Sequence, residues 1–244
     1  MDSSDYNTYS SQVDSISVIL LFLLAEHTKL SIMTCDVSNA FVTAPNSEKV
    51  WAVAGDEFGD KKGCKVEIQR ALYGLAGSAQ AFADFLADTL LRMGFTPSRA
   101  DPDLWIKESD SGFHYIASHV DDIIVTSKTP QEFISQIEQE YALRNIEVDP
   151  SYYLGSRLSR RPDGKILMNM DEYCKEVIRK YEEKHKITIK KENIPISVDA
   201  QPEMDTSDIL DENGYRDFQH IIGVGQWGRI DITYAISSLS RFVR

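Results

Sequence analysis

Two adjacent aspartates set between apolar runs are the feature that most restricts how this chain of 244 residues can fold. Asp121 and Asp122 follow the β-rich run 113–118 and precede the apolar run 123–125, so both carboxylates are predicted at the tip of a β-hairpin. An isolated Asp-Asp pair is typical of a charged turn, because aspartate is a favoured turn residue. The apolar flanks argue against that interpretation, since two carboxylates at a buried tip need a metal ion or another cation to compensate them.

The periodicity of apolar residues predicts an α+β fold around this hairpin. Strands are predicted over residues 31–35, 49–54, 64–68, 104–107, 113–118, 123–125, 152–158 and 165–170. Helices are predicted from 13 to between 27 and 30, over 78–93, from 129 to Tyr141, over 173–181, over 215–227, and over 231–243 with Asp231 as the N-cap.

One predicted strand ends at Asp36, far from the hairpin in sequence. Strand, helix, hairpin and helix form a β-α-β-β-α-β arrangement, in which distant strand ends become neighbours in one sheet. Asp36, Asp121 and Asp122 are therefore expected to lie together. Carboxylate oxygens are the ligands that hard cations prefer, and two Mg²⁺ ions roughly 3.5–4 Å apart can hold the attacking and leaving oxygens of a phosphoryl displacement.

Membrane insertion, secretion and cysteine-based scaffolds are not expected. The apolar run Ile16–Ala25 is shorter than the roughly 18–20 residues of a membrane span, and acidic rather than basic residues precede it. We therefore expect a buried helix without a signal peptide or transmembrane segment. Cys35, Cys64 and Cys174 form no C-x-x-C pair, which argues against a zinc knuckle or a disulfide framework. We infer an intracellular setting, in the cytoplasm or the nucleus.

Charge is distributed unevenly along the chain. With 26 basic and 38 acidic residues, the net charge of −12 argues against a broadly basic surface for nucleic acid. Segment 157–191 nevertheless holds eleven basic residues against six acidic ones, whereas segment 199–217 holds seven acidic residues and one basic. The acidic segment is predicted to be a solvated linker. The basic segment allows two interpretations, a helix that faces phosphates and a charged surface that serves solubility.

Four sequence blocks, in a fixed order and spacing, carry a resemblance. They are residues 36–41 (DVSNAF), 70–75 (RALYGL), 101–105 (DPDLW) and 119–124 (HVDDII), with weaker blocks at 153–155, 221–223 and 231–235. On these blocks the chain resembles the polymerase region of copia-type retrotransposon reverse transcriptases from about Ser15 to its C-terminus. A nucleotide cyclase or another palm enzyme would share the carboxylates but would leave the second and third blocks unexplained.

The resemblance implies a metal site and a nucleotide site. The catalytic residues would be Asp36, Asp121 and Asp122, which would bind two Mg²⁺ or Mn²⁺ ions together with Val37. Nucleotide contacts are implied for Ser38, Asn39, Ala40, Phe41, Tyr73 and Gly74. Within this set, the residues before Phe41 would touch the triphosphate, Phe41 resembles the gate that excludes a ribose 2′-hydroxyl, and Tyr73 would face the substrate.

The resemblance also implies how the chain is divided. Residues 1–150 would form a palm with remnant fingers, 151–198 a primer-grip-like hairpin with a basic thumb-like helix, 199–214 an acidic linker and 215–244 C-terminal helices. Nucleic-acid contacts are implied for Tyr153, Leu154, Gly155, Arg157, Arg160 and Arg161. The implied function is RNA-directed DNA polymerisation, with an RNA or DNA template–primer and deoxynucleoside triphosphates as partners, no membrane, and an oligomeric state left open.

Departures from the family pattern leave an alternative open. Residues 76–82 lack the basic residues that usually follow the second block, and His119 stands where tyrosine is usual. The N-terminal fingers strands and the ribonuclease H, integrase and protease segments are not found in this sequence. The chain is therefore either a fragment of a larger polyprotein or a decayed or repurposed copy. The alternative function is a catalytically silent palm-like module that binds nucleic acid or protein.

Other notable side chains are interpreted as structural. His119 is expected to be a partly buried strand residue beside the carboxylates, and Cys35 to be a small core residue. Packing roles are also expected for Phe82, Phe85, Trp105 and Trp227. Phe41 remains open between a gate and an ordinary core aromatic.

Overall fold

The computed structural model of the chain describes residues 12–197, 201–204, 206, 208–226 and 230–243. Its residues divide into two compact units, Met1–Pro150 and Ser151–Arg244. No helix in the described ranges is both long enough and apolar enough to cross a membrane.

The first unit is built on a six-stranded sheet. Its strands are β1 (Ser31–Val37), β4 (Thr96–Pro97), β5 (Leu104–Ser109), β6 (Gly112–His119), β7 (Asp122–Ser127) and β8 (Leu143–Val148). They lie in the order β4-β5-β6-β7-β1-β8, and each pair of neighbours is antiparallel. Segments far apart in the sequence therefore become neighbours in the sheet, where β1 lies between β7 and the edge strand β8.

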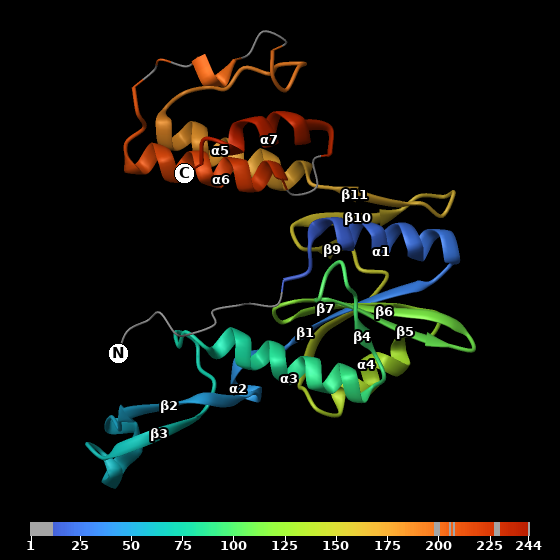
Figure 1. Ribbon diagram of the computed structural model, residues 1–244, viewed down its shortest axis with the longest axis vertical. Coiled ribbons are helices and arrows are strands. Elements are labelled where there is room, and N and C mark those ends of the chain that lie inside the picture. The colour runs from blue at the N-terminus through green and yellow to red at the C-terminus, as the bar shows by residue number, and fades with distance from the viewer. Residues whose placement is uncertain (1–11, 198–200, 205, 207, 227–229, 244) are drawn as a thin grey trace. The chain divides into compact units, whose positions relative to one another are not determined.

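Helices lie on both faces of this sheet. Figure 1 shows α1 (Ser15–Thr28) on one face, and α3 (Ser78–Arg92) with α4 (Pro130–Glu138) on the other. The main core lies under α3 and α4 and contains apolar residues of β1, β6 and β7. The amphipathic spacing of α3 predicts this contact, because its apolar residues recur every three to four positions. Gly94 follows α3 with a φ of +86°, as expected for a helix stop.

The expectation that Ile16–Ala25 forms a buried helix is wrong for one side of α1. Val18, Leu21, Phe22 and Ala25 are buried, as is Ser17. Ile16, Leu20 and Leu23, in contrast, are exposed by 64%, 50% and 57%. The apolar residues of α1 lie on all sides of the helix. The sequence pattern therefore does not indicate which side is exposed.

A two-stranded ribbon extends from the sheet. It consists of β2 (Pro45–Val53) and β3 (Lys65–Arg70), joined through the 3-10 helix η2 (Asp56–Lys61), and the two strands pair with each other only. A short helix, α2 (Ala40–Thr43), connects β1 to the ribbon. In Figure 1 the ribbon points away from the six-stranded sheet. The strands predicted over 49–54 and 64–68 are confirmed within a few residues.

The end of α4 and the strand that follows it differ from the prediction. The helix begins at Pro130 as predicted, although the Thr129 side chain makes no capping hydrogen bond. It ends at Glu138, so Tyr141 follows the helix and does not lie on its apolar face. Strand β8 has no counterpart among the predicted elements, because its burial pattern is almost wholly exposed and its alternation of apolar and polar residues is weak.

The second unit contains a small sheet and helices. The sheet has the order β11-β10-β9, with β9 (Tyr152–Tyr153), β10 (Ser156–Arg160) and β11 (Ile166–Asn169). The strand predicted over 152–158 is thus wrong in its centre: Leu154 and Gly155 form a turn with φ values of +42° and +81°. Two glycine-like conformations in succession break a strand and reverse its direction.

The helices of the second unit also shift two predicted boundaries. They are α5 (Asp171–His185), α6 (Glu212–Gln226) and α7 (Thr233–Ser240), with 3-10 turns η3 (Pro202–Met204) and η4 (Ile230–Ile232). Because α6 begins at Glu212, the end of the predicted linker 199–214 is helical. The N-cap of α7 is Ile232, so the prediction of Asp231 is wrong. Trp227, predicted to pack, lies outside the described residues.

Candidate active site

The three predicted catalytic aspartates lie where the C-terminal end of β1 meets the N-terminal end of β7. These strands are antiparallel neighbours, and Asp36 is the register partner of Asp122. Asp121 belongs to the turn between β6 and β7, and its carbonyl accepts a hydrogen bond of 2.9 Å from the Val37 backbone N–H. The pairing of β1 with β7 therefore brings residues from distant parts of the sequence to one place, and Val37 is tied to the hairpin turn.

Strand alternation places these carboxylates on the face away from the main core. Cys35 and Val37 are buried in the core beneath α3 and α4. Successive side chains of a strand point to opposite faces, so Asp36 lies on the other face, as does Asp122 beside the buried Ile123. Asp121 and Asp122 are both partly buried. The core thus lies behind the site, and the carboxylates are partly buried on the opposite face of the sheet.

The charges of the aspartates act on one another. Burial raises the pKa of Asp122, and the negative charges of Asp121 and Asp36 raise it further, whereas His119 and Arg144 oppose the shift. Burial, followed by the charges of Asp36 and Asp122, raises the pKa of the Cys35 thiol to about 12. Cys35 is therefore a neutral core residue, as expected, and His119 is a partly buried strand residue beside the carboxylates.

Sequence reasoning missed one residue of this site, Arg144. It lies on β8 as the register partner of Asp36, and its guanidinium donates hydrogen bonds to both carboxylate oxygens, from Nε to Oδ1 and from Nη2 to Oδ2. These hydrogen bonds to Asp36 raise the pKa of Arg144. The residue could not be placed beside Asp36 from the sequence because β8 itself was not predicted.

The donor chemistry of the three carboxylates suits a hard divalent cation. All donors are oxygens, and their mutual repulsion, seen in the raised pKa of Asp122, would be relieved by added positive charge. Within the described part of the chain, however, no three His, Cys, Asp or Glu side chains already stand in an arrangement that could hold a metal ion. Arg144 supplies positive charge to Asp36 instead.

The predicted nucleotide contacts lie on the turn after β1, at the start of α2, and on the loop before α3. The Ser38 N–H donates to the Ala142 carbonyl at 2.8 Å, Asn39 is exposed in a left-handed conformation, and Ala40 is buried. Phe41 is partly buried against the core, with its ring centroid 4.6 Å from that of Tyr73 and 6.4 Å from that of Phe82.

Tyr73 and Gly74 lie on the second of these loops. The Tyr73 side chain is 65% exposed, and Gly74 has a φ of +94° that favours glycine. The contact between Phe41 and Tyr73 means that the structure brings the two loops together. In this aromatic pair, Phe41 packs against the core and Tyr73 faces solvent.

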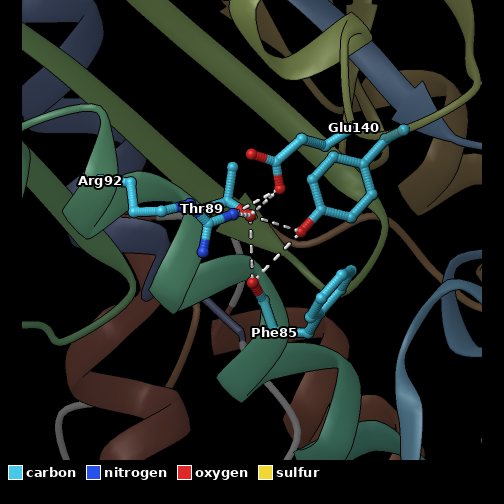
Figure 2. Close-up of polar contacts among 5 residues, drawn as sticks. Phe85, Thr89, Arg92 and Glu140 are labelled. Atoms are coloured by element: carbon cyan, nitrogen blue, oxygen red, sulfur yellow. Dashed lines mark hydrogen bonds and ion pairs between the residues drawn. The ribbon is translucent and has the colours of Figure 1, made fainter.

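A polar network holds α3 to the segment between α4 and β8 (Figure 2). The Thr89 hydroxyl lies 2.9 Å from both the Glu140 carboxylate and the Tyr141 hydroxyl, and Arg92 forms an ion pair with Glu140. Tyr141 donates to the Phe85 carbonyl at 3.2 Å, and burial raises the pKa of this tyrosine to about 12. This network fixes the residues immediately before Ala142, whose carbonyl holds Ser38.

Comparison with known proteins identifies the family. The family described as reverse transcriptase (RNA-dependent DNA polymerase) matches residues 1–196, well over half of the chain. The chain belongs to this family. The expected resemblance to copia-type retrotransposon reverse transcriptases is confirmed, since the relatives below are retrotransposon proteins.

Three relatives illustrate the similarity of this reverse transcriptase region. The retrovirus-related Pol polyproteins from transposons RE1 and RE2 of Arabidopsis thaliana are 26% and 24% identical to it over 248 residues, covering 98% of this chain and 16% and 17% of the relatives. The putative transposon Ty5-1 protein of Saccharomyces cerevisiae is 25% identical over 222 residues, covering 86% of this chain and 69% of the relative. The chain thus spans about one sixth of the length of the two polyproteins.

The DPDLW block of this reverse transcriptase region has a structural role. The buried Asp101 accepts hydrogen bonds from the backbone N–H groups of Asp14 at 2.9 Å and Asp103 at 3.0 Å. The buried Asp103 accepts one from the Gln12 N–H at 3.0 Å, and Trp105 is buried as expected. Because Asp14 is also the N-cap of α1, the block fastens the beginning of this helix to the sheet.

Replacing Asp101 by alanine should lower the free energy of unfolding by about 1–3 kcal/mol, because two backbone N–H groups lose their acceptor. Chemical denaturation measures this loss, and hydrogen exchange at the Asp14 amide should become faster. Asp110→Ala, in an exposed hairpin turn, is the matched control and should change stability by no more than about 0.5 kcal/mol. Equal stability of the two variants would contradict the fastening role.

The predicted nucleic-acid contacts of the reverse transcriptase region all belong to the second unit. Tyr153 is buried, and Leu154 and Gly155 form the turn between β9 and β10. Arg157, Arg160 and Arg161 are exposed on and after β10. Tyr153, Leu154 and Gly155 therefore have a structural role in the hairpin, while the three arginines place positive charge at its surface.

The basic helix α5 carries its own counter-charges. Arg179 pairs with Glu176 and Glu183, Lys175 with Glu172 and Lys184 with Asp217 of α6. Such i,i+3 and i,i+4 pairs are typical of a solvated helix face. The structure therefore favours the solubility interpretation of this helix over a surface that faces phosphates.

Proposed function

We propose that the chain is the polymerase core of an RNA-directed DNA polymerase of a copia-type retroelement. The single observation that carries the proposal is the register pairing of Asp36 with Asp122, with Asp121 in the adjoining turn. Family membership supports it. The strand order β8-β1-β7-β6, with α3 and α4 on one face, supports a palm of the ferredoxin-like type within residues 1–150.

The site residues receive separate roles in this proposal. Asp36, Asp121 and Asp122, with the Val37 backbone, would hold two Mg²⁺ or Mn²⁺ ions, which when bound supply positive charge to the transferring phosphoryl group. The backbone from Ser38 to Ala40 would bind the triphosphate of a deoxynucleotide. Phe41 and Tyr73 would contact its sugar, since Phe41 follows Asp36 by five residues and its ring packs against the ring of the exposed Tyr73.

The remaining parts of the chain receive separate assignments in this proposal. The ribbon β2–β3 is assigned to remnant fingers, residues 151–198 to a primer-grip-like hairpin and a thumb-like helix, 199–211 to a linker and 212–244 to C-terminal helices. Template–primer would contact the β10 arginines. The cysteines are free, which suits work in a reducing intracellular compartment.

One observation favours a second function. Arg144 already pairs with Asp36, and a catalytic carboxylate neutralised within its own chain suits a silent palm-like module that binds nucleic acid or protein. The test is extension of a DNA primer on an RNA template by the full chain with Mg²⁺ and with a chelator. Extension that the chelator abolishes supports the polymerase, and template–primer binding without any extension supports the silent module.

Binding of template–primer should be weak, because few cations contact phosphates, and should fall as salt rises, because each contact releases counterions. Changing Arg157, Arg160 and Arg161 together to alanine should weaken binding and reduce the slope of log affinity against log salt by about 2–3. Fluorescence anisotropy at two salt concentrations measures both quantities.

The control for this triple variant changes three cations of α5, Lys175, Arg179 and Lys180, which are already paired with glutamates. It should leave the salt slope nearly unchanged. A slope that responds equally to both triple variants would show that net charge, and not the β10 arginines, governs binding.

A further inference from the structure

The ion pair between Arg144 and Asp36 uses both oxygens of the carboxylate. The Arg144 Nη2 lies 3.1 Å from Asp36 Oδ2, while its Nε donates to Oδ1. This two-pronged geometry is the strongest form of an arginine–carboxylate contact. It occupies one acceptor position on each oxygen of Asp36, so a metal ion that takes these positions has to displace the guanidinium.

The backbone pairing of β1 with β8 positions Arg144 opposite Asp36. The pairing of β1 with β8 shifts register between Thr34 and Asp36, so that Asp36 rather than Val37 faces Arg144 across the ladder. Irregular pairing of this kind redirects side chains and occurs often next to active sites. The segment before β8 is held by the Thr89 network. Arg144 is therefore presented from a fixed backbone.

The two partners differ in how freely they can move. The Asp36 side chain is 16% exposed and belongs to a central strand, whereas the Arg144 side chain is 56% exposed on an outer strand. A long and largely hydrated side chain can leave the pair while the aspartate stays in place. Asp121 and Tyr73 also act electrostatically on the guanidinium, so it lies amid the residues assigned to the site.

We propose that Arg144 is an internal counter-ion that occupies Asp36 when no divalent cation is bound and is released when one binds. The inference rests on the proposed function, because it takes Asp36 as a metal ligand. Metal binding and arginine release are then a single exchange. The guanidinium substitutes for the missing positive charge among the carboxylates, and the free chain avoids an uncompensated cluster of negative charge.

The exchange lowers the apparent affinity for metal, because only the fraction of molecules with a free Asp36 can bind. Arg144→Ala should therefore bind Mn²⁺ about 2- to 5-fold more tightly than the wild type, as expected for the loss of one partly exposed competing ion pair. Calorimetric titration of the full chain with MnCl₂ measures this change.

Two variants separate displacement from a general effect of charge. Arg144→Lys keeps the positive charge but loses the two-pronged contact, so it should also bind Mn²⁺ more tightly than the wild type. Arg216→Ala removes an arginine that pairs with Glu212 in the second unit and should titrate like the wild type. An Arg144→Lys variant with wild-type affinity would overturn displacement, because only a through-space charge effect would then remain.

Thermal melting supplies a readout that a purely structural ion pair would not give. Without metal, Arg144→Ala should melt below the wild type, since the ion pair is lost. With saturating Mn²⁺ the difference should disappear, because the wild type has released the pair as well. Equal lowering of the melting temperature with and without Mn²⁺ would overturn the exchange.

The failure of the exchange and the failure of the metal site have different signatures. If the wild type binds Mn²⁺, Asp121→Asn abolishes this binding and Arg144→Ala titrates like the wild type, the exchange alone is wrong. If the wild type binds no Mn²⁺ that depends on Asp121, the metal site is wrong and the exchange falls with it.

Discussion

Asp121→Asn is expected to abolish Mn²⁺ binding and to reduce RNA-templated primer extension by roughly a thousandfold, about 4 kcal/mol of transition-state stabilisation. The substitution keeps the size of the side chain but removes a charge from the turn between β6 and β7. Burial and the charges of Asp121 and Asp36 raise the pKa of Asp122, so this variant also relieves repulsion in the metal-free chain. Calorimetry with MnCl₂ and single-nucleotide extension measure the two losses.

Asp110→Asn is the matched control, because Asp110 lies in the exposed turn of the neighbouring β5–β6 hairpin. It should bind Mn²⁺ and extend primers like the wild type. The Asp121→Asn variant should melt no lower than the wild type without metal, so loss of function cannot come from unfolding. Undiminished Mn²⁺ binding by Asp121→Asn would show that this carboxylate is not a metal ligand.

The sequence predicts the centre of the fold because strong apolar runs form it. β1 and β7 are almost fully buried, and runs of this kind leave little choice of structure. The Asp-Asp pair between two such runs predicts the hairpin, and the structure adds the register that sets Asp122 opposite Asp36. Register is a property of two strands together, so a single run cannot specify it.

Strand β8, which supplies Arg144 to the site, could not be predicted from the sequence. Five of the six residues of β8 are exposed, so neither apolar periodicity nor burial marks it as a strand. It forms because β1 offers an unpaired edge, and backbone hydrogen bonds to that edge outweigh weak local preference. From the sequence alone, Arg144 therefore resembles any other charged surface residue. Only the pairing of β8 with β1 brings it next to Asp36.

In helix α1 the apolar pattern is strong, but it does not predict which residues are buried. Its residues are apolar all round, which predicts burial on every side, yet Ile16, Leu20 and Leu23 remain exposed. The N-cap Asp14 and its contact to Asp101 decide where the helix begins and how it is fastened. These bonds join residues that are far apart in sequence, so no local pattern contains them.

Phe41→Ala is expected to increase incorporation of ribonucleotides relative to deoxynucleotides by roughly 5- to 150-fold, if the ring excludes a 2′-hydroxyl by steric clash. Forcing an extra group into a well-ordered site costs about 1–3 kcal/mol, which sets this range. The ring is partly buried and packs on the exposed Tyr73, so one side of the pair is open to a sugar. Single-nucleotide incorporation with paired ribo- and deoxynucleotides measures the ratio.

A core role for Phe41 predicts a different outcome. Truncating a fully buried phenylalanine costs about 3–5 kcal/mol of stability, and loss of both activities together would follow. Phe85→Ala is the matched control, because Phe85 is also partly buried against the same core but contacts Tyr141 rather than Tyr73. Similar melting temperatures for the two variants, with altered sugar selectivity in Phe41→Ala alone, would assign the gate. Unchanged selectivity in a well-folded Phe41→Ala protein would leave Phe41 as a packing residue, because its removal would then open no space at the sugar.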